Sequence, residues 1–127
     1  AATDIPLRWK SLASGATKTV RQQGDLVYVE TEIPARWARA GARAHAQYSK
    51  QGNQWVGTVH RTVPCTVNRY TIFERIQICR LEAPTKLTVV SPTRIEGATF
   101  YSDGKLKCGS CKTKGTPKWH FFTWIPE

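Results

Sequence analysis

The chain has 127 residues, 40% of them hydrophobic and 22% charged, which allows one modest core and excludes both global disorder and a second independent domain. Lysine and arginine number 19 against 9 acidic residues, and this net charge of +10 favours anionic partners or a solvated basic surface. No segment approaches the roughly 18 consecutive apolar residues of a transmembrane helix, so we expect a soluble protein.

Residues 1–15 form an N-terminal segment ahead of the first predicted strand. The segment begins Ala1-Ala2-Thr3-Asp4 without a methionine, as a mature chain does after cleavage at a small-residue site. Four cysteines in a small domain also indicate an exported protein, because disulfides persist in oxidising compartments. We therefore expect a secreted or periplasmic protein.

The first two predicted strands form a hairpin. Residues 17–23 are rich in β-forming side chains, and Gly24 and Asp25 follow as a turn. Residues 26–33 are again dense in β formers and end before Pro34. The spacing predicts that these two segments pair with each other.

The next stretch fits two interpretations. The alanines and arginines of residues 36–46 suit a helix, but Gly41 interrupts them. Residues 42–48 alternate strictly between alanine or tyrosine and a polar or charged side chain, which is typical of a strand. We expect a short loop or helical turn around Trp37, followed by a strand that ends at the turn of residues 51–53.

Further strands are predicted in the middle of the chain. Residues 55–63 form one that ends at Pro64, and residues 70–81 form the longest β-rich run. Residues 86–90 and 94–101 follow as two more. The chain thus has about seven strands spaced roughly ten residues apart, which is typical of a sandwich or an up-and-down barrel.

The last part of the chain, residues 103–127, differs in character. A stretch rich in Lys, Gly and Cys comes first, and an aromatic segment, residues 119–125, follows it. Because this terminal strand is so apolar, we expect it to pack on the domain. The predicted fold class is all-β: residues 1–127 form a single antiparallel domain, a barrel or sandwich of about seven to eight strands with a disulfide-bearing C-terminal segment.

The four cysteines have three interpretations. A predicted hairpin separates Cys65 from Cys79, and Cys108 and Cys111 form a tight CxxC. The first interpretation is therefore two local disulfides, Cys65–Cys79 and Cys108–Cys111. The second is a zinc site of four thiolates, although a zinc ribbon needs a second CxxC. The third is a redox CxxC, which requires a helix that the nearby glycines disfavour. Disulfides are the favoured interpretation, and no metal or cofactor is predicted.

No residue pattern predicts an enzyme. His45, His60 and His120 are far apart in strand-like segments, where surface or core positions account for them. The sequence has no Gly-x-Ser-x-Gly, HExxH or Gly-rich phosphate loop. Five glutamates could form a glycosidase-like pair but are better assigned to the wet face of a sheet: Glu30, Glu32, Glu74, Glu82 and Glu96.

Aromatic residues carry the main indication of a binding site. The chain has five tryptophans and four tyrosines, which suit core packing in a small β domain. The alternative is an aromatic-lined pocket, or a platform for bases or sugar rings. The candidate ligand-binding residues combine aromatic and basic side chains: Trp37, Arg39, Arg43, Tyr48, Trp55 and Arg61.

The strand cadence resembles that of the calycin group, the lipocalin-like small β-barrels. Residues 24–30 (Gly-Asp-Leu-Val-Tyr-Val-Glu), residues 51–57 (Gln-Gly-Asn-Gln-Trp-Val-Gly) and Ile95-Glu96-Gly97 carry the resemblance. The Gly-x-Trp signature of lipocalins is missing, since residues 7–9 are Leu-Arg-Trp, and no family binding residues are carried over. The resemblance implies a barrel whose interior or mouth holds a small ligand.

The leading hypothesis is an exported, non-enzymatic β-barrel or sandwich that binds a small or anionic ligand. A rival is a basic nucleic-acid-binding module with a zinc knuckle at Cys108 and Cys111, whose affinity would fall steeply with salt. A third possibility is a structural subunit that self-associates through strand edges and its aromatic C-terminus.

Overall fold

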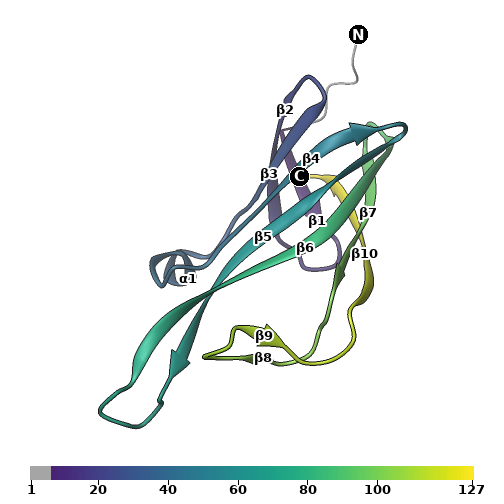
Figure 1. Ribbon diagram of the computed structural model, residues 1–127. Helices are drawn as coiled ribbons and strands as arrows, with labels where there is room; N and C mark the ends of the chain where they lie inside the picture. Colours follow the sequence, from purple (N-terminus) through teal and green to yellow (C-terminus); the bar gives the residue numbers. More distant parts are fainter. Residues whose placement is uncertain (1–6) are drawn as a thin grey trace.

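Strand-forming segments separated by short turns follow one another along the chain. The computed structural model, which describes residues 7–127, closes eight of them into an antiparallel barrel (Figure 1). The barrel strands are β1 (Arg8–Ser11), β2 (Thr17–Gln23), β3 (Leu26–Thr31), β4 (Arg43–Gln51), β5 (Gln54–Val67), β6 (Arg75–Ser91), β7 (Arg94–Tyr101) and β10 (Lys118–Pro126). Their order around the barrel is β1-β10-β7-β6-β5-β4-β3-β2. The all-β prediction is confirmed, and the architecture is a barrel rather than a sandwich.

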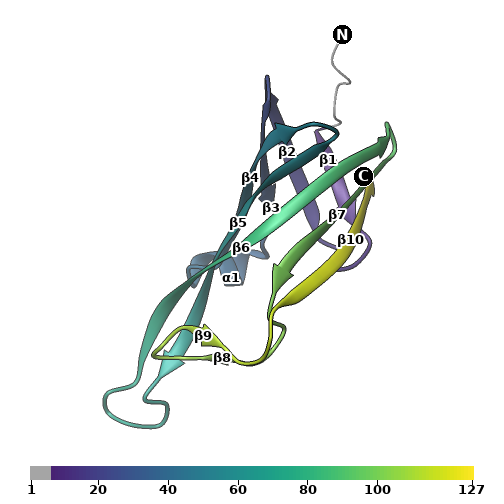
Figure 2. The same ribbon diagram turned by 45° about the vertical axis from the view of Figure 1, so that its right-hand side comes forward.

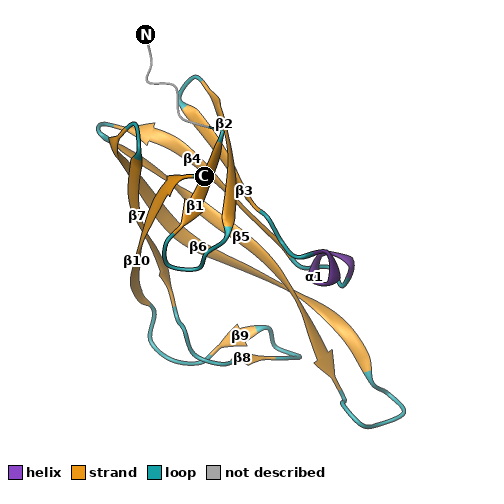
Figure 3. Ribbon diagram, turned by 180° about the vertical axis from the view of Figure 1, so that it is seen from behind, coloured by secondary structure: helices purple, strands orange, loops and turns teal. Residues whose placement is uncertain are grey.

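The remaining described elements are small. Strands β8 (Leu106–Lys107) and β9 (Lys112–Thr113) form a separate hairpin, and the helix α1 (Ala35–Arg39) lies outside the barrel (Figure 3). Within residues 7–127, no helix has the length and apolar character needed to cross a bilayer. The predicted mature N-terminus, Ala1 to Asp4, falls outside the described residues.

The two ends of the described chain close the barrel. The predicted hairpin of β2 and β3 is confirmed, with Val20 opposite Val29. The aromatic terminal strand β10 pairs with β7 along its length and with β1 near its end, as in the pair of Ser11 and Trp124. The sequence pattern missed β1, because this strand has only four residues. Closure leaves no open edge within the paired part of the barrel.

Strands β5 and β6 are longer than predicted. β5 continues through Pro64, and β6 is one strand through Pro84 instead of two separate strands. Pairing of β5 with β4 ends at Thr62, and pairing of β6 with β7 begins at Thr85. Both prolines therefore lie where a strand has an open edge, the position at which a sheet tolerates the missing N–H.

Beyond the barrel, β5 and β6 continue as a two-stranded ribbon. We call residues 63–67 and 75–79, with their connecting loop 68–74, the arm. The arm extends away from the barrel, and the β8–β9 hairpin lies at the same end of the molecule (Figures 1 and 2). The predicted strand start at residue 70 is wrong, since β6 begins at Arg75 and residues 70–74 belong to the loop.

Two disulfides tie the β8–β9 hairpin to the arm. Cys65 of β5 is bonded to Cys108, and Cys79 of β6 is bonded to Cys111, with Cα–Cα distances of 5.7 and 5.3 Å. Disulfides are thus confirmed, but the predicted local pairs Cys65–Cys79 and Cys108–Cys111 are wrong. Cys79 lies opposite Val63 rather than Cys65, so the two arm cysteines share a face without facing each other. The CxxC hairpin supplies a partner for each.

Large apolar side chains fill one half of the barrel. Trp9, Trp55 and Trp124 are almost completely buried there. Trp55 is the second residue of β5, beside the turn that follows β4, at the end opposite the arm. Burial of such rings contributes on the order of 2–3 kcal/mol each to stability. This half of the interior, as the described residues form it, is solid, and the cavity that they line lies in the half nearer the arm.

Candidate ligand-binding cavity

A cavity of about 690 Å³ occupies the half of the barrel from which the arm extends. Successive side chains of a strand point to opposite faces, so every second residue points inward. Ala46 of β4 is paired with Val59 of β5, and both line the interior. The apolar wall comes from five strands: Val29, Ala46, Val59, Leu81, Ala83 and Phe122.

Aromatic side chains form the floor of this cavity. Trp124 is buried, and the ring of Phe122 stacks on it with a centroid distance of 5.2 Å. Gly97 of β7 lies under the Phe122 ring, and a Cβ at this position would collide with the ring. The glycine therefore lets the ring lie flat against the wall, which preserves space above it.

A chain of hydroxyl groups crosses the wall above the floor. Thr85 Oγ1 lies 3.2 Å from Tyr48 Oη and 3.0 Å from Thr99 Oγ1, and it donates a hydrogen bond to the Ala98 carbonyl. Because Thr85 has one proton and uses it on that carbonyl, Tyr48 and Thr99 both donate to Thr85. Burial raises the pKa of Tyr48 to about 12, so this hydroxyl stays protonated at neutral pH.

Lys18 of β2 places an amine inside the barrel. Its Nζ donates to Thr31 Oγ1 at 2.7 Å and lies 5.8 Å from the Trp124 ring centroid. Burial, and secondly the nearby positive charge of Arg61, lower the pKa of Lys18 from 10.5 to about 8. The amine is therefore mostly charged at neutral pH, in surroundings that disfavour its charge.

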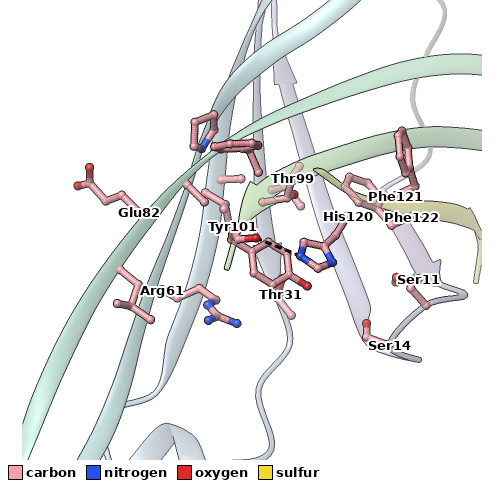
Figure 4. Close-up of a pocket in the computed structure, with 18 of the residues that line it drawn as sticks. Ser11, Ser14, Thr31, Arg61, Glu82, Thr99, Tyr101, His120, Phe121 and Phe122 are labelled. Atoms are coloured by element: carbon pink, nitrogen blue, oxygen red, sulfur yellow. Dashed lines mark hydrogen bonds between the residues drawn. The ribbon is translucent and has the colours of Figure 1, made fainter. Parts of the chain in front are cut away.

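Arg61 of β5 adds a second cation. It is paired with Leu81 and lines the same cavity as Lys18. Among the described residues that line the cavity, Glu82 is the only acid, and its carboxylate lies 3.3 Å from His60 Nδ1. Figure 4 shows Glu82 turned away from the space that the other labelled side chains surround. Two cationic side chains thus share a cavity into which no described lining residue directs a carboxylate.

Tyr101 and His120 stand at the mouth. Their rings stack with a centroid distance of 3.9 Å, and His120 Nε2 lies 3.0 Å from the Tyr101 carbonyl oxygen (Figure 4). A carbonyl only accepts hydrogen bonds, so His120 Nε2 carries a proton. The pair forms a flat aromatic wall beside the entrance, next to Ser102 and Pro117.

The buried amine of Lys18 makes stability depend on pH. Its pKa is about 8 in the folded state and near 10.5 in the unfolded state, so the unfolded state binds more protons between these values. We expect the free energy of unfolding to rise across this range, by at most about 3 kcal/mol. Urea titrations of the wild type and of Lys18→Met from pH 7 to above pH 10 measure this contribution by difference. Parallel stability profiles for the two proteins would contradict it.

The structure brings two of the six predicted ligand-binding residues together. Tyr48 and Arg61 both line the cavity. Trp55 is buried in the solid half of the core. The other three belong to the region of α1 and the start of β4, outside the cavity lining, and a ligand role for them stays a prediction: Trp37, Arg39 and Arg43.

The three histidines lie in two different parts of the barrel. The rings of His45 and His60 stack on each other at 5.0 Å, and the ring of Tyr28 stacks on His45 at 5.6 Å. This stack and the ion pair of His60 with Glu82 lie on the outer wall of the barrel. His120 lies at the cavity mouth, on the inner face of β10, and His45 also contributes to the cavity lining.

Sequence reasoning missed Lys18, which carries the strongest electrostatic feature of the cavity. A signal was present, because Lys18 shares a strand face with Val20, which is buried. A lysine on the apolar face of a strand indicates an inward amine only when closure of the sheet is known.

The architecture is compatible with the calycin-like barrels that the strand cadence resembles, since eight antiparallel strands close around an interior cavity. This compatibility concerns the shape of the barrel alone. Comparison with known proteins finds no family model, no curated protein and no solved structure that matches this chain.

Proposed function

We propose that this protein binds a small amphipathic organic anion inside its barrel and does not act on it chemically. The observation that carries the proposal is the placement of Lys18 and Arg61 in one cavity without an inward acid among the described lining residues. Lys18 is partly buried, and burying a cation is unfavourable unless a counter-charge compensates it. Arg61 is exposed and brings a second positive charge to the same cavity. A bound carboxylate, sulfonate or phosphate ester supplies that counter-charge.

The rest of the cavity suits an apolar body attached to the anionic group. Aliphatic side chains and the rings of Phe122 and Trp124 line most of it. Its volume of about 690 Å³ lies within the range of small-molecule sites. Such a space accommodates a medium-chain fatty acid or an aromatic acid, with the acidic group between Lys18 and Arg61. This use of the interior is the one that the calycin resemblance implies.

We also propose that the protein works outside the cytoplasm. All four cysteines form disulfides, which is compatible with an oxidising compartment. The pairing engages both Cys108 and Cys111 with the arm, which removes the thiolates that a zinc knuckle would use. Disulfides therefore favour an exported carrier over the zinc-dependent nucleic-acid module.

Calorimetric titration with decanoate, indole-3-acetate and the neutral analogue decanol tests the binding proposal. We expect the acids to bind and decanol to bind far more weakly. Arg61→Gln is expected to weaken acid binding about 10- to 100-fold, the value of a lost charge-assisted hydrogen bond. The control is Arg21→Gln, because Arg21 lies on the outer wall against Tyr28 and Glu30.

Equal binding of decanoate and decanol, or an unchanged affinity in Arg61→Gln, would contradict the anionic ligand. Absence of binding across carboxylates, sulfonates and phosphate esters of this size would overturn the proposal as a whole. Salt-sensitive binding of single-stranded oligonucleotides with an empty cavity would favour the nucleic-acid alternative instead.

A further inference from the structure

The loop at the end of the arm exposes large apolar side chains. Tyr70 is 91% exposed, Ile72 94% and Phe73 70%, and Ile76 at the start of β6 is 64% exposed. We call these four residues the arm tip. An isolated exposed side chain needs no explanation, but a cluster of four at the end of a projecting ribbon marks an interaction surface.

The conformation of the loop holds these side chains outward. Thr71 Oγ1 donates to the Asn68 carbonyl at 2.6 Å and accepts from the Phe73 N–H at 3.2 Å. Asn68 Nδ2 donates to the Phe73 carbonyl at 3.4 Å. Tyr70 has a φ of 66°, a left-handed conformation that an aromatic residue rarely adopts. The internal hydrogen bonds thus maintain a strained loop that presents its rings to solvent.

The disulfides brace the arm behind this loop. Cys65 and Cys79 bind the CxxC hairpin to one face of the ribbon, and Gln77 on the same face donates to the Gly109 carbonyl at 3.3 Å. Ile76 and Ile78 lie on the opposite face, and both are exposed. The arm therefore holds its apolar end at a defined place far from the barrel (Figure 1).

Basic side chains surround the arm tip. Arg69 lies in the loop, Arg75 follows it, Arg80 lies further along β6, and Glu74 is the only acid of residues 63–81. The disulfides add the exposed lysines of the β8–β9 region beside the arm: Lys105, Lys107, Lys112 and Lys114. The apolar end of the arm is thus set in a strongly cationic surrounding.

We infer that the arm tip inserts into the interfacial region of an anionic lipid bilayer. The tip is a convex projection, so it suits a fluid surface that yields to it. Tyr and Phe favour the membrane–water interface, and arginine side chains reach head groups while their stems stay in apolar surroundings. Each Lys or Arg near an anionic membrane adds to the attraction. This inference does not depend on what the cavity binds.

Flotation of the full-length protein with lipid vesicles tests this inference. We expect the protein to float with vesicles of phosphatidylcholine and phosphatidylglycerol in about 0.1 M salt, and to be released in about 1 M salt. Ile72→Ser/Phe73→Ser is expected to reduce the partition coefficient on the order of 100-fold, because two apolar side chains no longer insert. The matched control is Leu12→Ser/Phe121→Ser, which removes two side chains that are 59% and 79% exposed outside the arm.

A charge variant separates the two contributions to binding. Arg69→Gln/Arg75→Gln is expected to weaken binding to anionic vesicles at least several-fold while the weak binding to pure phosphatidylcholine stays unchanged. Failure of the wild type to float with anionic vesicles would overturn the inference. Equal losses in the arm-tip and control variants would also overturn it. Dimerisation that the arm-tip variant abolishes, without vesicle binding, would assign the surface to a second copy of this chain.

Discussion

Replacing Cys65 and Cys79 together by alanine is expected to lower the free energy of unfolding by more than about 4 kcal/mol, because this double variant loses both disulfides. The Cys65→Ala/Cys108→Ala variant loses one bridge, which spans 43 residues, and is expected to lose about 4 kcal/mol. Chemical denaturation of both variants without reductant measures the difference.

The comparison discriminates between two disulfide patterns. With local pairs, Cys65→Ala/Cys79→Ala would remove one bridge and Cys65→Ala/Cys108→Ala would remove two, so the order of stabilities would be reversed. The Cys79→Ala/Cys111→Ala variant is the matched control, since it removes the other bridge alone. Peptide mapping of the non-reduced wild type gives an independent check, with the fragment of residue 65 linked to that of residue 108.

The Lys18→Met substitution is expected to stabilise the protein and to abolish most of its ligand binding. The charged amine of Lys18 is destabilising inside the barrel, as its lowered pKa of about 8 indicates. An apolar side chain of similar length removes that cost, so the free energy of unfolding at pH 7 is expected to rise by about 1–3 kcal/mol. The loss of the cation is expected to weaken binding of an organic acid about 10- to 100-fold.

Lys10→Met is the matched control, because Lys10 lies on the exposed face of β1. We expect its stability to change by less than about 0.5 kcal/mol and its ligand affinity to stay constant. Urea denaturation and calorimetric titration give the two readouts. If Lys18→Met unfolds more easily than the wild type and binds the acid as tightly, Lys18 has a structural role and the proposed anion site is wrong.

Such opposite effects on stability and binding are typical of functional sites. Groups that a ligand must meet are kept in surroundings that are unfavourable without it. The cavity interior has this character at Lys18, whereas the described residues of the other half of the barrel pack as buried apolar side chains. The residues of the mouth and the arm lie at the same end of the molecule, so a ligand of the proposed kind would enter beside the cationic end.

Local pattern alone determined the fold class and several strands. Alternation and turn residues located the β2–β3 hairpin, and the apolar character of residues 119–125 predicted a docked terminal strand. The number of cysteines and the size of the domain indicated disulfides. Each of these features depends on neighbouring residues or on composition, which a sequence displays directly.

Only the tertiary structure decided which distant residues meet. Closure of the sheet turned the face of Lys18 into the inside of a barrel, and it separated Arg61 and Tyr48 in the cavity from Trp37 on α1. The disulfide partners depended on the two-residue offset between Cys65 and Cys79 across the ribbon and on the hairpin that covers their face. Register, closure and the packing of one hairpin on another depend on residues that are far apart in the sequence. A local pattern of side chains therefore does not reveal them.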